Sequence, residues 1–159
     1  MAAAEEAGAT VRMFDLRLLD LPFFVPGEAP SAAAEEFLDA TFEADGLVWS
    51  SPMYHGAISG AFKNALDWFE LLRDRTPPYL TDKVVGLISS AGGAQGLQAV
   101  NTMEYVVRAL RGFAIPLVVP ISARSAFDAE GNVVDERVND QLRHLGEELA
   151  AICLRRRPA

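Results

Sequence analysis

Residues Val84-Val85-Gly86-Leu87-Ile88 decide the fold class, because this run is apolar and carries no polar face. Strands of this kind are covered by helices on both sides of a sheet, which is typical of parallel sheets. On either side of this run, the apolar pattern predicts further strands. The predicted strands cover residues 11–16, 46–51, 83–89 and 116–121. Apolar residues at helical spacing predict helices over residues 31–42, 58–72, 97–110 and 138–152.

This alternation of strand and helix predicts the topology. Strand, helix, strand, helix implies right-handed crossovers and a doubly wound parallel sheet between two helical layers. The chain has 159 residues, which fits one domain, and no linker or internal repeat divides it. We therefore expect a single three-layer α/β/α domain over residues 1–159.

The composition of the chain argues against several classes of function. The formal net charge is -8, which argues against general nucleic-acid binding because phosphates repel an acidic surface. Cys153 is the only cysteine, so an intrachain disulfide is excluded. His55 and His144 are too few and too far apart for a His-rich metal site. The longest apolar run, 113–121, contains two prolines and is too short for a membrane span, so a soluble cytoplasmic protein is expected.

Two segments after predicted strands have the content of a ligand site. The first is Ser51-Pro52-Met53-Tyr54-His55-Gly56, in which Tyr54 offers a flat face and Gly56 permits close backbone approach. The second is Ser89-Ser90-Ala91-Gly92-Gly93-Ala94-Gln95-Gly96, whose glycines leave backbone N–H groups free. Ligands of doubly wound sheets bind at the carboxyl ends of strands. We therefore predict that both segments converge on a slot for a planar heterocycle.

The first of these segments continues into a motif. Residues 51–68, Ser-Pro-Met-Tyr-His-Gly-Ala-Ile-Ser-Gly-Ala-Phe-Lys-Asn-Ala-Leu-Asp-Trp, resemble the signature of the NADPH-dependent FMN reductase family. That signature is Pro-x-Tyr, a small or amide residue and Gly, followed by Lys-Asn-x-x-Asp-Trp on a helix. Residues 89–93 resemble the second flavin loop of the family. Similarity extends from about Thr10 to the last helix.

The resemblance implies a flavodoxin-like fold that carries FMN, is reduced by NADPH or NADH and passes electrons to a small acceptor. By this resemblance the isoalloxazine is bordered on one side by Pro52, Met53, Tyr54, His55 and Gly56. Its other edge is closed by Ser89, Ser90, Gly92, Gly93 and Gln95. Relatives commonly form homodimers or homotetramers through the helix after the first loop, which makes Trp68 and Phe69 interface candidates, with core packing as the alternative for Phe69. No catalytic acid or base is expected, because the flavin performs the redox chemistry.

The chain departs from the family pattern at its front end. The family opens with a strand and a Gly-Ser-x-Arg-x-x-Ser loop that cradles the FMN phosphate, whereas this chain starts inside what would be the following helix. The expected sheet therefore lacks its first strand, and the strand over residues 11–16 lacks its usual neighbour. We expect Met1 to be an internal or misassigned start. If the 159-residue form is genuine, weak FMN retention is expected.

Two other functions remain open. One is a non-catalytic flavodoxin-like module that has lost tight FMN binding, as the missing phosphate loop suggests. The other is a flavodoxin-type electron carrier, which the acidic charge fits and the motif Lys63-Asn64-x-x-Asp67-Trp68 opposes. Preference between NADPH and NADH usually depends on an arginine near the ribose phosphate, and Arg124 is one possibility.

Overall fold

A computed structural model gives the structure of the chain and describes residues 1–156. Its elements follow in the order α1 (Ala2–Glu6), α2 (Ala32–Glu43), β1 (Gly46–Tyr54), β2 (Ala57–Ile58), α3 (Gly60–Asp67), η1 (Trp68–Leu72), β3 (Val84–Ala91), η2 (Ala94–Gly96), α4 (Leu97–Ala109), β4 (Phe113–Ser122), α5 (Ala123–Ala126) and α6 (Glu136–Arg156). The sheet order is β2-β1-β3-β4. β1, β3 and β4 are parallel, and the short β2 is antiparallel to the end of β1.

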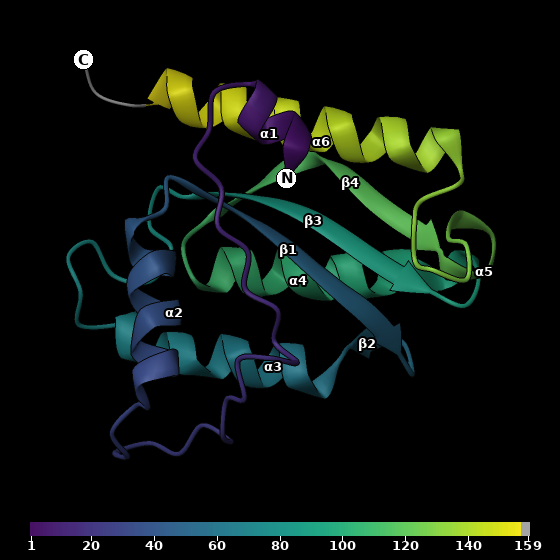
Figure 1. Cartoon of the computed structure of the whole chain (residues 1–159). Coiled ribbons are helices and arrows are strands. Elements are labelled where there is room, and N and C mark those ends of the chain that lie inside the picture. The colour runs from purple at the N-terminus through teal and green to yellow at the C-terminus, as the bar shows by residue number, and fades with distance from the viewer. Residues whose placement is uncertain (157–159) are drawn as a thin grey trace.

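Helices cover both faces of the sheet (Figure 1). One face packs against α2, α3, η1 and α4, and its core includes Trp49, Phe69, Leu87 and Met103. The other face packs against α6 through a second cluster that includes Val119 and Leu145. Central β3 is buried along nearly its whole length, which confirms the three-layer α/β/α architecture predicted from its uniform apolarity. Among residues 1–156, no helix combines the length and apolar character needed to cross a membrane.

The strand predicted for residues 11–16 is wrong, because that segment forms no strand. Its apolar side chains are accommodated in another way. Phe14 contacts the ring of Phe37 on α2 edge-on at 5.4 Å, and Leu16 packs against the α2–α4 core. A strand is defined by its hydrogen-bonded ladder, and β1, the nearest end of the sheet, pairs only with β2 and β3 among the described residues. On the side away from β3, β1 is therefore paired only at Met53 and Tyr54, by β2, and its edge over residues 46–52 has no strand partner among the described residues.

Candidate functional site

The first predicted loop lies partly inside a strand. β1 continues through Pro52 and Met53 to Tyr54, so only His55 and Gly56 connect it to β2. Both connecting residues have positive φ, 51° for His55 and 82° for Gly56, as a two-residue hairpin turn of type I′ requires. The segment is thus a stiff hairpin at the carboxyl end of β1. Tyr54 is 60% exposed on it, so its ring is free to contact a ligand.

Ser51 fixes this hairpin to the start of α3. Its hydroxyl is fully buried, donates to the carbonyl of Pro52 at 2.9 Å and accepts from the backbone N–H of Ser59 at 3.1 Å. Ser59 in turn caps α3 by accepting from the N–H of Phe62 at 3.2 Å. The chain therefore enters α3 along a path set by two serine hydroxyls.

The second predicted loop leaves the neighbouring strand. β3 runs to Ala91, and Gly92 and Gly93 follow it with exposed backbone before η2 and α4. Ser89 is fully buried, and its hydroxyl donates to the carbonyl of Gly96 at 2.7 Å. A Cβ at Gly96 would lie 2.9 Å from this hydroxyl, so a glycine is needed for the close approach. Ser89 thus holds the loop from beneath.

The two segments lie side by side. In the parallel pairing of β1 and β3, Ser51 is opposite Ser89 and Pro52 is opposite Ser90. The hairpin also approaches α4, because a Cβ on Gly56 would lie 3.0 Å from Oε1 of Gln98. The structure therefore brings the two predicted loops together at the carboxyl edge of the sheet. Gln98 was missed, because nothing in its sequence context distinguishes it from any polar residue in the first turn of a helix.

The Lys-Asn-x-x-Asp-Trp motif has a structural role. Asn64 accepts from the N–H of Phe24 at 3.0 Å and donates to the carbonyl of Pro22 at 2.9 Å. The indole N–H of Trp68 donates to the same carbonyl at 3.0 Å. Lys63 and Asp67 form an ion pair one turn apart. The motif thus ties the long loop before α2 to the helix that follows the hairpin.

The prediction that Trp68 and Phe69 lie at an interface between subunits is wrong. Each side chain is only 2% exposed. The ring of Phe69 stacks on Phe37, and the ring of Trp68 meets Phe24 edge-on. Both side chains point from η1 into the main core, so their apolar surface is buried within the chain.

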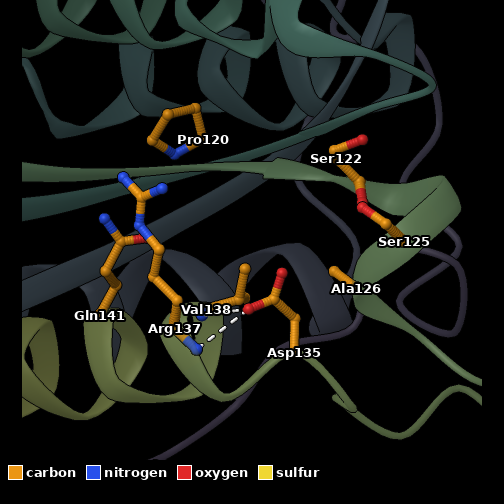
Figure 2. Close-up of a pocket in the computed structure, with 8 residues that line it drawn as sticks. All are labelled: Pro120, Ser122, Ser125, Ala126, Asp135, Arg137, Val138 and Gln141. Atoms are coloured by element: carbon orange, nitrogen blue, oxygen red, sulfur yellow. Dashed lines mark hydrogen bonds between the residues drawn. The ribbon is translucent and has the colours of Figure 1, made fainter.

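The carboxyl edge extends to β4. Ala91 pairs with Ser122, and Arg124 follows in α5 with its Nε 3.9 Å from where a Cβ on Gly92 would sit. A pocket of about 210 Å³ opens over the end of β4 and the start of α6 (Figure 2). A second pocket, of about 480 Å³, lies near Lys83 and Cys153 at the opposite edge of the sheet.

Comparison with known proteins identifies the family. Residues 1–125 match the profile of NADPH-dependent FMN reductase. The chain is 32% identical to the NADPH-dependent FMN reductase ArsH of Rhizobium meliloti, over 92% of this chain and 60% of that protein. It is also 32% identical to an NADPH:quinone oxidoreductase of Arabidopsis thaliana, over 88% of this chain and 71% of that protein. The chain belongs to the NADPH-dependent FMN reductase family.

Solved structures agree on the fold. An oxidoreductase from Corynebacterium diphtheriae superposes with a TM-score of 0.78 at 21% identity, over 98% of this chain and 83% of that one. The flavoenzyme FerB of Paracoccus denitrificans gives 0.73 at 18% identity, over 96% and 86% of the two chains. A WrbA-like flavodoxin from Agrobacterium tumefaciens gives 0.62 at 17% identity, over 77% and 74%. The flavodoxin-like fold predicted from the sequence is confirmed. The chain spans about 60% of the length of the first curated relatives it matches.

The residues present fit the ring portion of FMN. Gly92 and Gly93 expose their backbone, and a Cβ on Gly93 would meet nothing within 4 Å, so a planar ring can approach this backbone closely. Tyr54 offers an exposed aromatic face on the neighbouring strand. These two segments supply no lysine or arginine for the FMN phosphate. The fit of these two segments is thus to the ring portion alone.

Proposed function

We propose that this chain forms the flavin-binding core of an oxidoreductase that passes electrons from NADPH or NADH to flavin, quinone or a similar small acceptor. The observation that carries the proposal is the pairing of Pro52 with Ser90, which places the Tyr54 hairpin beside the Gly92-Gly93 loop. The names of the relatives support the acceptor class, because they include a quinone oxidoreductase and FMN-dependent azoreductases.

Each segment has its own part in this proposal. On the hairpin, Pro52, Met53, His55 and Gly56 border the ring and Tyr54 packs against it. On the loop, backbone N–H groups of Gly92 and Gly93, with Ser90 and Gln95, face the polar edge of the ring. Backbone donors placed there stabilise negative charge that develops when the ring accepts hydride. FMN, when bound, supplies the redox chemistry itself.

The buried serines maintain this arrangement. Ser51 holds the hairpin through the Ser59 N–H, and Ser89 holds the loop through the Gly96 carbonyl. Preorganised donors need no rearrangement when charge develops, and this is the main advantage of a rigid site. Ser89 therefore contributes by positioning the loop, since its hydroxyl is already engaged within the protein.

FMN titration tests the ring site. We expect FMN fluorescence to be quenched on binding, and Tyr54→Ala to raise the dissociation constant by about tenfold, since stacking on an aromatic face contributes about 1–3 kcal/mol. Tyr105→Ala is the matched control, because Tyr105 is 66% exposed on α4 away from the hairpin. Equal effects of the two substitutions would contradict the assignment of Tyr54.

Anaerobic mixing with NADPH tests the activity. We expect bleaching of the FMN absorbance by NADPH and its return when a quinone is added. Flavin that binds but is not bleached by NADPH or NADH would indicate an electron carrier that depends on a separate reductase. Absence of FMN binding at saturating concentration would indicate a non-catalytic module.

We further propose a homodimer or homotetramer in the cytoplasm, on the family resemblance alone. Trp68 and Phe69 are excluded as its contacts by their burial. Sedimentation velocity over a range of concentrations tests this proposal, and a single monomeric species at every concentration would overturn it.

A further inference from the structure

An arginine side chain reaches the loop that borders the proposed flavin ring. Arg124 lies in α5 (Ala123–Ala126), which directly follows β4. Its Nε is 3.9 Å from where a Cβ on Gly92 would lie. In the part of the chain that the structure describes, no atom beyond the adjoining residues is closer to that position, and a Cβ on Gly93 would meet nothing within 4 Å. The space over this part of the loop is thus open except for the Arg124 side chain.

The pairing of β3 with β4 accounts for the position of Arg124. Ala91 is opposite Ser122 in the parallel ladder. Gly92 follows Ala91 by one residue, and Arg124 follows Ser122 by two, so both leave the sheet at its carboxyl edge from neighbouring strands. Ligands of doubly wound sheets bind at this edge. The register of the sheet therefore places Arg124 beside the proposed ring site.

Arg124 brings to this edge a positive charge that the two ring-binding segments lack. Residues 51–56 and 89–96 contain no lysine or arginine. Among the described residues no carboxylate forms an ion pair with Arg124, so its charge is not neutralised locally. Several other arginines also lack an ion pair, so this property alone assigns no role. The contact with the loop is what distinguishes Arg124.

A positive charge at this edge matters because hydride transfer makes the ring more negative. The transfer oxidises the nicotinamide to its cationic form and adds two electrons and one proton to a neutral ring, which gains one negative charge. The chain has a formal net charge of -8, and the field of an acidic protein opposes a further negative charge. A fixed positive group near the ring offsets this opposition without any rearrangement.

We propose that Arg124 lies against the polar edge of the FMN ring, beside the N–H groups of Gly92 and Gly93, and raises the reduction potential of bound FMN by stabilising the reduced ring. The inference rests on the proposed binding of FMN at these two loops. A charge near the ring is one of the means by which a protein sets the electronic properties of a flavin. Arg124 thus tunes the cofactor, while the hairpin and the loop hold it.

A redox titration of bound FMN tests the inference. The protein is equilibrated with a chemical reductant and a reference dye, and no nicotinamide is present. Arg124→Ala is expected to weaken the binding of reduced FMN relative to oxidised FMN by about tenfold, because a contact with a charged group is lost. For a two-electron couple this factor lowers the potential by about 30 mV. Arg124→Lys is expected to keep most of the potential, because it keeps the charge.

Riboflavin separates a contact with the ring from a contact with the phosphate. Riboflavin has the same ring as FMN and no phosphate, so a charge beside the ring acts on both flavins alike. We expect Arg124→Ala to lower the potential of bound riboflavin by the same amount as that of bound FMN. A loss of affinity for oxidised FMN with unchanged binding of riboflavin would assign Arg124 to the phosphate and overturn the inference.

Arg155→Ala is the matched control, because it removes an exposed arginine from the far end of α6. Equal shifts of the potential in Arg155→Ala and Arg124→Ala would reflect net charge alone, and an unchanged potential in Arg124→Ala would show no contact with the ring. Either result would overturn the inference. Circular dichroism confirms that each variant is folded, and Arg124→Gln removes the charge if the alanine variant does not fold. Bleaching of FMN by NADPH is a separate readout, so the proposed function can hold while this inference fails.

Discussion

Single residues beneath the loops determine the shape of the candidate site. Ser51 and Ser89 are each fully buried, and each uses its hydroxyl to hold backbone of the adjoining segment. Removing one partner of a buried hydrogen bond leaves the other unsatisfied, which costs more than the bond itself contributes. The stability of the site is therefore sensitive to these small side chains.

Ser51→Ala tests this sensitivity. The substitution leaves the buried N–H of Ser59 without its acceptor, so we expect the free energy of unfolding to fall by about 1–3 kcal/mol. Urea denaturation provides the measurement. Ser50→Ala is the control, because Ser50 is the neighbouring exposed residue of β1. Comparable losses in the two variants would show that the Ser51 hydroxyl has no special role.

Gly96→Ala tests the second loop. A methyl group there would lie 2.9 Å from the Ser89 hydroxyl and 3.3 Å from Cβ of Pro120, and such overpacking costs about 1–3 kcal/mol. Gly93→Ala is the matched control, because its Cβ would be in open space and its φ of -158° is extended backbone. Thermal unfolding that shifts equally in both variants would contradict this account.

At the residue scale, the residue types of the two segments were enough to predict a ligand site, but they did not predict which side chains are exposed. The content of both segments pointed to a ligand site at neighbouring strand ends, and the two segments do lie together. The sequence could not show which of Ser89 and Ser90 is buried, because alternate residues of a strand face opposite sides of the sheet. Ser89 proves to be fully buried, whereas Ser90 is partly exposed.

At the scale of elements, prediction succeeded where the sequence of a strand is continuously apolar. β3 and β4 were found because apolar strands with helices on both sides have a clear pattern. The segment 11–16 has residue types that are equally typical of a strand. A strand also needs a neighbouring backbone to pair with, and the local sequence does not show whether such a neighbour is present. β2 was not predicted, because a strand of two residues is too short to show an alternating pattern of apolar and polar side chains. The His55-Gly56 turn was therefore interpreted as part of a loop.

The titratable amine of Lys83 contacts the C-terminal end of α2. Lys83 is half-buried and donates to the carbonyls of Phe42, in the last turn of α2, and Ala44, its C-cap, at 2.6 Å each. Burial lowers the pKa of Lys83 below its ordinary value of 10.5, and the charge of Asp45 partly offsets this. The folded protein thus binds this proton less tightly than the unfolded chain does, so unfolding takes up a proton between the two pKa values.

Lys83→Met tests this linkage. Because proton uptake on unfolding becomes less favourable as pH rises, we expect the contribution of Lys83 to stability to grow as pH approaches 10.5. The stability difference between the unmodified protein and Lys83→Met should therefore widen from pH 7 to pH 10. Lys63→Met is the control, because Lys63 is largely exposed in an ion pair on α3. A difference that stays constant or narrows with pH would contradict the buried-amine account.

At the scale of the whole molecule, the edge of β1 over residues 46–52 has no strand partner among the described residues. Val48 on this strand is 49% exposed. The same strand carries the hairpin of the candidate site. Unpaired strand edges with apolar side chains are templates for pairing with another chain. The flavodoxin-like sheet thus remains open to association at this edge.

Val48→Lys is expected to reduce self-association at high protein concentration, because a charge on an edge strand opposes pairing between copies. Sedimentation equilibrium measures the association constant. Val134→Lys is the control, since Val134 is 57% exposed outside the sheet. If both variants associate as strongly as the unmodified chain, the β1 edge is not the contact.

The packing of the first helix on the last has a consequence for synthesis. Ala3 and Ala4 approach Gly146 on α6, and Glu6 forms an ion pair with Arg143 at 2.9 Å, across a separation of 137 residues. A helix of five residues does not persist on its own, because nucleation outweighs so few hydrogen bonds. Residues 2–6 therefore emerge from the ribosome long before their partner surface exists. They acquire helical order only after nearly the entire polypeptide has been translated.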